Sequence, residues 1–227
     1  MDDLDRAVLT WTVVIPQKDL YLAKSRMALG DADRRDVVLA MFDDTLASVK
    51  AARLVSRVIV VCDNAADAIT LGRDGVITQV NVSGGGLNTS IMAGVTLARD
   101  LTPRTAIAVL PADLPGLKPG ELDRALIIAS RHARSFIRDA SGSGTTLLSA
   151  LPDQELQPSY GPSSRARHAL SGAQEIGDGN DLESLRDDVD DLESLHRIIA
   201  TEGAGARTSR IFAAITAELR HPYGVSL

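Results

Sequence analysis

The chain has 227 residues, of which 44% are hydrophobic and 24% are charged, so its composition is typical of a globular domain. Its net charge of −6 argues against the basic surface of a general nucleic-acid binder. The acidic start, residues 1–6, does not resemble a signal peptide, and no apolar run approaches the ~20 residues that span a bilayer. We therefore expect a cytoplasmic protein with one domain, residues 1–227, and no nucleic-acid or membrane partner.

Cysteine usage excludes two kinds of stabilising site. Cys62 is the only cysteine, so neither an internal disulfide nor a thiolate zinc site is available. It follows the apolar residues Ile59, Val60 and Val61, which indicate the end of a buried strand. We expect Cys62 to be a buried residue without a chemical role.

Short apolar runs alternate with amphipathic segments in the first half of the chain. The runs predict strands over residues 11–16, 57–62, 76–80 and 105–110, covered on both faces. The segments between them predict a helix capped by Asp31 and further helices over 64–71 and 87–98. This alternation is typical of a largely parallel sheet with right-handed crossovers.

The order of elements is less regular after residue 120. Apolar spacing predicts helices over residues 121–130, 163–170, 192–200 and 208–219. Strands are expected over 135–138 and 145–150, around a Ser- and Gly-rich turn that could cradle a phosphate or simply close a hairpin. No segment is long enough to separate two domains.

Two loops at the expected carboxyl ends of strands could bind anions. The loop after the first strand carries Lys18, Lys24, Ser25 and Arg26, and such cations can hold a triphosphate. The alternative is a solvated surface loop. Residues 84–86 are three glycines directly before a helix, where backbone amides can face an anion. They are equally typical of a flexible turn.

Carboxylates at two other places could hold a metal ion. Asp113 lies between two prolines just after the strand 105–110. If residues 188–190 are extended, Asp188 and Asp190 point to the same side and Val189 points to the other. Carboxylates directed at one point repel unless a cation lies between them, which favours a hard metal cation at this place. The alternatives are a turn aspartate and a solvated acidic run.

Together, and in order, these segments resemble one family: the guanylyltransferases of coenzyme F-420 biosynthesis, which act on 2-phospho-L-lactate or phosphoenolpyruvate. The matching segments are residues 11–16, Lys18, 23–26, 84–88, 110–115, 144–148, 160–164 with His168, and Arg186 with 188–190, and they span about residues 11–195. The family usually continues Thr-Pro after the position of Asp190, whereas here Asp191 and Leu192 follow. This departure leaves Asp187 and Asp191 as competing carboxylates.

The resemblance implies a fold, a reaction and a set of site residues. The fold is the GT-A-like, Rossmann-like nucleotidyltransferase fold, in which helices flank a mixed, mostly parallel sheet. The reaction joins GMP from GTP to a small phosphorylated acid and releases pyrophosphate, with one or two Mg²⁺ ions. By position, Asp113, Asp188 and Asp190 match the metal ligands, Thr146, Gly161 and Ser164 the acid site, Lys18, Lys24, Ser25 and Arg26 the triphosphate loop, and Gly86 and Asn88 the nucleotide side. Lys24 and the three aspartates are the expected catalytic residues.

Several alternatives stay open. We favour phosphoenolpyruvate as the acceptor because the Arg- and Ala-rich composition fits the actinobacterial branch of the family, and 2-phospho-L-lactate is the alternative. Sugar-phosphate nucleotidyl transfer is disfavoured because the first strand is not followed by a Gly-rich loop. A non-catalytic nucleotide-binding regulatory module is disfavoured because all three metal-type aspartates are present. A homodimer is left open, and no residue clearly reads the guanine base.

Overall fold

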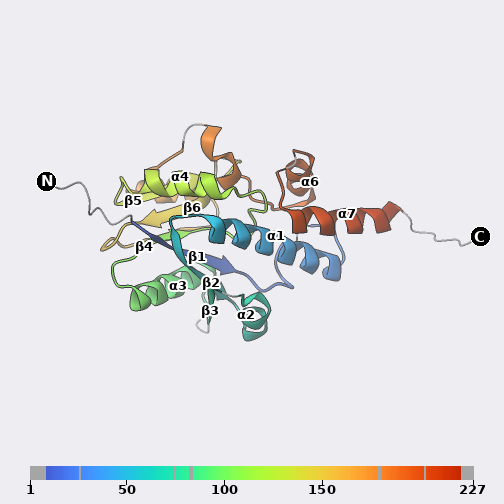
Figure 1. Cartoon of the computed structure of the whole chain (residues 1–227), viewed down its shortest axis with the longest axis horizontal. Coiled ribbons are helices and arrows are strands. Elements are labelled where there is room, and N and C mark those ends of the chain that lie inside the picture. The colour runs from blue at the N-terminus through green and yellow to red at the C-terminus, as the bar shows by residue number, and fades with distance from the viewer. Residues whose placement is uncertain are drawn as a thin grey trace, which may run out of the picture.

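A seven-stranded mixed sheet with helices on both faces forms the centre of the computed structural model (Figure 1). The structure describes residues 9–25, 27–73, 75–81, 84–177, 180–201 and 203–220. The spatial order of the strands is β3-β2-β1-β4-β6-β5-β7. Their bounds are β1 Trp11–Gln17, β2 Val55–Cys62, β3 Val76–Val80, β4 Ala106–Val109, β5 Arg134–Arg138, β6 Thr145–Ala150 and β7 Gln174–Glu175.

The helices connect these strands and cover the sheet. Their bounds are α1 Asp31–Ala51, α2 Ala65–Leu71, α3 Leu87–Leu101, α4 Pro119–Ala129, α5 Ser164–Leu170, the 3-10 helix η1 Asn180–Leu185, α6 Leu192–Ala200 and α7 Ala206–Arg220. Helix α1 is capped one residue earlier than expected, because Gly30 is the N-cap and Asp31 lies in the first turn. The negative charge of Asp31 stabilises the helix N-terminus, where no side chain makes a capping hydrogen bond.

The expected α/β sheet is confirmed, with a change of direction in its second half. Strand β1 pairs in parallel with β2 and β4, and β2 pairs in parallel with β3. Strand β6 is antiparallel to both β4 and β5, because residues 139–144 turn the chain directly back in a hairpin. The two-residue strand β7 and the helix η1 were not predicted, since such short elements have no readable apolar period.

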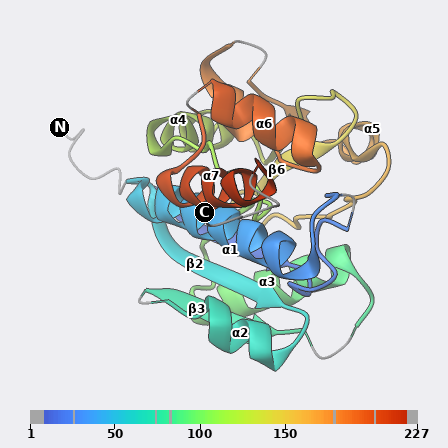
Figure 2. The ribbon, with the colours of Figure 1, turned by 90° about the vertical axis from the view of Figure 1, so that its right-hand side faces the viewer.

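Apolar side chains fill both faces of the sheet. Helices α1, α4, α6 and α7 lie on one face and α3 on the other, as two perpendicular views show (Figures 1 and 2). Gly94 allows α3 to approach closely, because a Cβ there would lie 2.6 Å from Val14 and 2.7 Å from Val61. Cys62 is fully buried, as expected, and burial first and then Asp67 and Asp63 raise its pKa to about 12, which disfavours the reactive thiolate.

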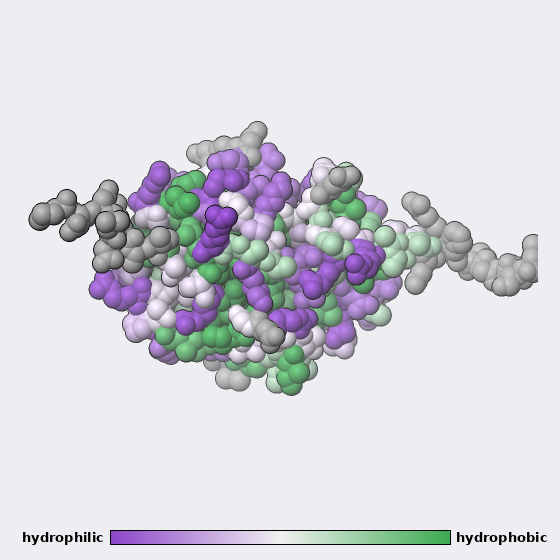
Figure 3. Space-filling view, viewed as in Figure 1, coloured by the Kyte–Doolittle hydropathy of each residue, from purple (hydrophilic) through white to green (hydrophobic). Residues whose placement is uncertain are grey.

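On the face shown in Figure 3, hydrophilic side chains are spread between smaller hydrophobic areas. Among the described residues, no helix has the length and apolar character needed to cross a membrane.

Candidate active site

A cavity of about 710 Å³ opens beyond the carboxyl ends of β1 and β4. This is the expected position for a ligand in an open α/β sheet. The cavity wall includes Lys18, Lys24 and Ser25 from the loop after β1, together with all three predicted metal-type aspartates, Asp113, Asp188 and Asp190. Gly161 and Ser164, two of the residues expected to hold the acid, line the same cavity. Segments far apart in the sequence therefore meet at one site.

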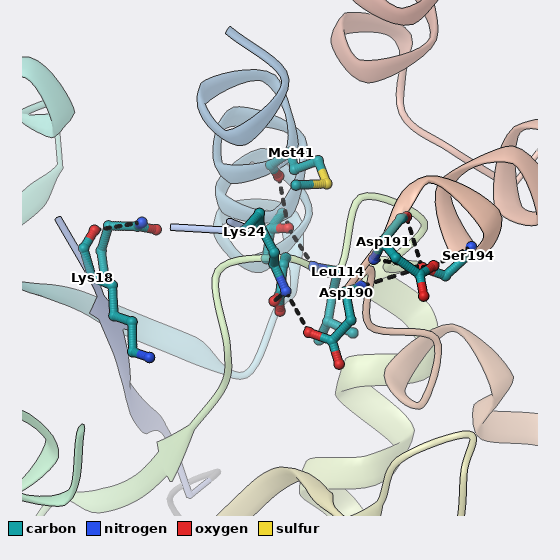
Figure 4. Close-up of polar contacts among 10 residues, drawn as sticks. Lys18, Lys24, Met41, Leu114, Asp190, Asp191 and Ser194 are labelled. Carbon is teal, nitrogen blue, oxygen red and sulfur yellow. Dashed lines mark hydrogen bonds and ion pairs between the residues drawn. The ribbon is translucent and has the colours of Figure 1, made fainter. Parts of the chain in front are cut away.

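Lys24 joins two of the aspartates directly. Its ammonium contacts Oδ2 of Asp113 and lies 2.7 Å from Oδ1 of Asp190, as Figure 4 shows for the second contact. Burial alone lowers the pKa of Lys24, but Asp113 and Asp190 raise it above its ordinary value by a larger amount. Lys24 is therefore a permanent positive charge between two carboxylates.

The backbone brings the second acidic segment to the first. The amide of Val189 donates a hydrogen bond of 3.0 Å to the carbonyl of Asp113, and the Val189 side chain is fully buried. The flanking Asp188 and Asp190 consequently face the cavity. Burial, then Asp113 and Asp190, raise the pKa of Asp188 to about 7, and Lys24 offsets only part of this effect. The site thus carries more negative charge than one lysine neutralises.

The loop that carries Lys24 is anchored on both sides of that residue, so Lys24 does not belong to the solvated surface loop that was the alternative. Leu20 and Met27 are buried on either side of it, and the Leu20 amide donates to the buried Asp67 carboxylate at 3.0 Å. Only 14% of the Lys24 side chain is exposed. Lys18 is exposed and lies apart from Lys24 in Figure 4, although both lysines line the cavity. Arg26 lies outside the described residues.

Helix α1 holds the segment after Asp113 in place through the side chain of Thr45. The Thr45 hydroxyl donates to the Met41 carbonyl at 2.8 Å and accepts the Leu114 amide at 3.1 Å (Figure 4). Leu114 is itself fully buried. The position of the Asp113 backbone is therefore set by neighbours that do not involve its carboxylate.

The two competing carboxylates have other partners. Asp191 is the N-cap of α6 and forms a capping box with Ser194, whose amide donates to Asp191 Oδ1 at 2.8 Å (Figure 4). These hydrogen bonds lower the pKa of Asp191. Asp187 pairs with Arg197 at 3.5 Å. Asp188 and Asp190 are left as the members of the acidic run that face the cavity.

The described residues do not form a ready-made metal cage. Among them, no group of three or more His, Cys, Asp or Glu side chains is close enough together to hold a metal ion. Asp113 Oδ1 is nevertheless buried and has no hydrogen-bond partner. Metal binding by Asp113, Asp188 and Asp190 remains a prediction.

The acid-side residues differ in how they face the cavity. Gly161 has a φ of +119°, which favours glycine, and Ser164 begins α5. Thr146 is only 1% exposed, and its hydroxyl is buried without a hydrogen-bond partner. The neighbouring Gly144 and Thr145 line the cavity instead. The Ser- and Gly-rich turn therefore both closes the β5–β6 hairpin and borders the site.

Two residues expected on the nucleotide side have different surroundings. Gly86 lines a smaller cavity of about 260 Å³, which also touches Lys18 and Leu87. The side chain of Asn88 is bonded to a backbone segment: its Oδ1 accepts the Tyr160 amide at 2.8 Å and its Nδ2 donates to the Tyr160 carbonyl at 3.1 Å. Both polar atoms of Asn88 are thus used within the protein.

His168 is a buried structural residue. It is fully buried, and its Nε2 accepts the Ser159 amide at 2.9 Å, which leaves the proton on Nδ1 to be donated to the Thr145 hydroxyl, also at 2.9 Å. Burial, then Arg167 and Arg134, lower its pKa to about 4. The sequence has no metal-ligand spacing around His168. Its hydrogen-bond partners become visible only in the three-dimensional structure.

His168 is expected to make the fold sensitive to acid. Because its pKa falls from 6.5 to about 4 on folding, its contribution to stability is complete above about pH 6.5 and is lost as the pH falls toward 4. The wild type should lose roughly 2–3 kcal/mol from this group between pH 7.5 and 4.5. Urea unfolding at both pH values should give a smaller difference for His168→Gln. An equal difference in both proteins would contradict this assignment.

Comparison with known proteins establishes the family. Residues 11–215 match the family described as "Guanylyl transferase CofC like". This chain belongs to that family. It is 42% identical over 207 residues to a phosphoenolpyruvate guanylyltransferase of Streptomyces scabiei, covering 88% of this chain and 95% of the relative. It is 41% identical over 212 residues to one of Thermomonospora curvata, covering 93% and 92%.

Solved structures support the fold of this CofC-like enzyme. A protein of Desulfovibrio desulfuricans G20, assigned to the nucleotide-diphospho-sugar transferases, superposes with a TM-score of 0.70 at 14% identity, over 93% of this chain and 97% of that one. A Mycobacterium tuberculosis protein in complex with manganese superposes with a TM-score of 0.54 at 21% identity, over 85% and 99%. The GT-A-like nucleotidyltransferase fold implied by the resemblance is therefore confirmed.

Proposed function

We propose that this enzyme joins GMP from GTP to phosphoenolpyruvate and releases pyrophosphate, as a step in coenzyme F-420 biosynthesis. The family and its relatives, which are named phosphoenolpyruvate guanylyltransferases, support the reaction and the acceptor. The structural observation that carries the proposal is the cavity, because Lys24 bridges Asp113 and Asp190 on the wall that also contains Gly161 and Ser164.

Opposite charges in this cavity suit two anionic substrates. Lys24, Lys18 and Ser25 can contact the triphosphate of GTP through charge and hydrogen bonds. Gly161 and Ser164 can offer backbone amides and a hydroxyl to the phosphorylated acid. We propose that the two substrates meet in front of Asp113 and that orientation supplies much of the catalysis.

The carboxylates fit a divalent cation. Three aspartates with one lysine leave an excess of negative charge. Burial raises the pKa of Asp188 most, and the neighbouring carboxylates Asp113 and Asp190 raise it further. Oxygen donors are what Mg²⁺ prefers, and the free Oδ1 of Asp113 offers one. We propose that Asp113, Asp188 and Asp190 hold Mg²⁺. When bound, it would neutralise charge between the acceptor phosphate and the α-phosphate.

No general base is required from the chain. The phosphate of the acceptor is already ionised at neutral pH, so its oxygen can attack the α-phosphorus without losing a proton. The new bond joins the acceptor oxygen to that phosphorus, while the bond to the bridging oxygen of pyrophosphate breaks. Lys24 can stabilise the negative charge on the departing group.

A substrate matrix tests the function. GTP, ATP, CTP and UTP are each combined with phosphoenolpyruvate, 2-phospho-L-lactate and 3-phosphoglycerate in the presence of Mg²⁺, and pyrophosphate release is measured. We expect the greatest kcat/KM with GTP and phosphoenolpyruvate. A preference for 2-phospho-L-lactate would reassign the acceptor. GTP binding without pyrophosphate release in any combination would favour a regulatory module.

A further inference from the structure

The segment from Ser159 to Ser164 is the last part of the connection from β6 to α5, and it has no regular structure before α5 begins at Ser164. Its residues Tyr160, Gly161 and Ser164 border the cavity. Gly161 and Ser163 both have positive φ, 119° and 56°, a backbone conformation that neighbouring contacts must maintain. The shape of this segment therefore depends on what holds it from outside.

Asn88 holds the segment from the side of α3. Its amide group accepts from the Tyr160 amide and donates to the Tyr160 carbonyl, at 2.8 and 3.1 Å. This pair of hydrogen bonds satisfies both backbone groups of Tyr160 as a neighbouring strand would. Asn88 lies in the first turn of α3, two residues after Gly86, whereas Tyr160 is 72 positions away in the sequence.

His168 holds the same segment from the side of α5. Its Nε2 accepts the Ser159 amide, and its Nδ1 bonds to the Thr145 hydroxyl on β6, each at 2.9 Å. Its ring also meets the Tyr160 ring edge to face, with centroids 5.2 Å apart. Adjacent residues, Ser159 and Tyr160, are thus fixed by two side chains that approach from different elements.

We propose that Asn88 and His168 are positioning residues for the phosphorylated acid, acting through the backbone of Ser159 and Tyr160. This rests on the proposed function, in which Gly161 and Ser164 bind that acid. It changes the role expected for Asn88, whose polar atoms serve the acceptor segment rather than the nucleotide. A helix that begins beside Gly86 on the nucleotide side consequently also sets the geometry of the acceptor side.

The test compares substrate constants in Asn88→Ala with those of the wild type and of Thr96→Ala. Thr96 is an exposed residue further along α3, whose hydroxyl donates to the Met92 carbonyl of its own helix, so its replacement is a matched control. Loss of the two Asn88 hydrogen bonds should raise the KM for phosphoenolpyruvate by about tenfold or more. The KM for GTP should stay close to that of the wild type. A higher KM for GTP with an unchanged KM for the acid would overturn the proposal.

Amide hydrogen exchange observed by NMR supplies a measurement that needs no substrate. The Tyr160 amide should lose at least about tenfold of its protection in Asn88→Ala and keep it in Thr96→Ala. Unchanged protection would show that the segment does not depend on Asn88.

The wild type is first assayed with GTP and phosphoenolpyruvate. Absence of turnover in that assay would count against the proposed function, whereas the exchange result tests the two Asn88–Tyr160 hydrogen bonds by themselves.

Two His168 variants extend the test to the other side of the segment. His168→Gln can place a side-chain oxygen near the position of Nε2 and still accept the Ser159 amide, whereas His168→Leu cannot. We expect the KM for phosphoenolpyruvate to rise more in the leucine variant than in the glutamine variant, with the KM for GTP unchanged in both. Equal KM values for the acid in the two variants would remove His168 from the proposal.

Discussion

Replacing Asp113 with asparagine should reduce turnover by roughly two to three orders of magnitude and leave the fold intact. Asparagine keeps the size of the side chain but removes the charge that contacts Lys24. It also removes a carboxylate proposed to hold Mg²⁺. The fold should survive because the Asp113 carbonyl still accepts the Val189 amide, and Thr45 still holds the Leu114 amide.

Asp187→Asn is the matched control for this variant. Asp187 belongs to the same acidic run as Asp188, but its carboxylate pairs with Arg197. Pyrophosphate release should be close to normal in Asp187→Asn, and circular dichroism should give both variants wild-type melting behaviour. If Asp113→Asn also retained near-normal turnover, Asp113 would be an ordinary turn residue and the proposed mechanism would fail.

Replacing Lys24 with methionine should lower kcat/KM for GTP by roughly ten- to a hundredfold. Loss of one charge-assisted phosphate contact costs about 1.5–3 kcal/mol, and about 1.4 kcal/mol corresponds to a tenfold change. Methionine preserves the apolar stem of a side chain that is only 14% exposed, so the effect of charge is separated from that of packing. The KM for phosphoenolpyruvate should change little, because Lys24 is assigned to the triphosphate.

The same variant should also be less stable at neutral pH. Lys24 is the cation between Asp113 and Asp190, and its removal leaves those two carboxylates and Asp188 to repel one another. Lys118→Met is the control, because that side chain is 66% exposed and does not line the cavity. Thermal melting and GTP kinetics are measured on both variants. Normal GTP kinetics in Lys24→Met would exclude the triphosphate role.

Asp113→Asn and Lys24→Met both test the ion pairs of Lys24, a feature that reading the chain segment by segment does not reveal. The sequence marks Lys24 as a cation after the first strand and Asp190 as part of an acidic run. Their contact joins residues 166 positions apart. It depends on the anchored loop around Leu20 and Met27 and on the Val189–Asp113 hydrogen bond, and neither has a local sequence signal.

By itself, the sequence determined the strands of the first half and the edge of the sheet where the cavity lies. Continuous apolar runs such as residues 57–62 are local signals, because a strand buried on both faces needs apolar side chains at every position. The ordered motifs also identified the family correctly. They selected Lys24, Asp113, Asp188, Asp190, Gly161 and Ser164, which all border one cavity.

Only the tertiary structure decided how those side chains are used. Asn88 and Gly86 stand in one motif, yet Asn88 bonds to Tyr160. His168 lacks any metal spacing, yet it bridges Ser159 and Thr145. The physical reason is that a hydrogen bond or an ion pair requires two groups to meet within about 3 Å, and sheet register and loop path set such distances between remote segments. Composition and periodicity report which residues are buried, but not which partner each polar atom finds.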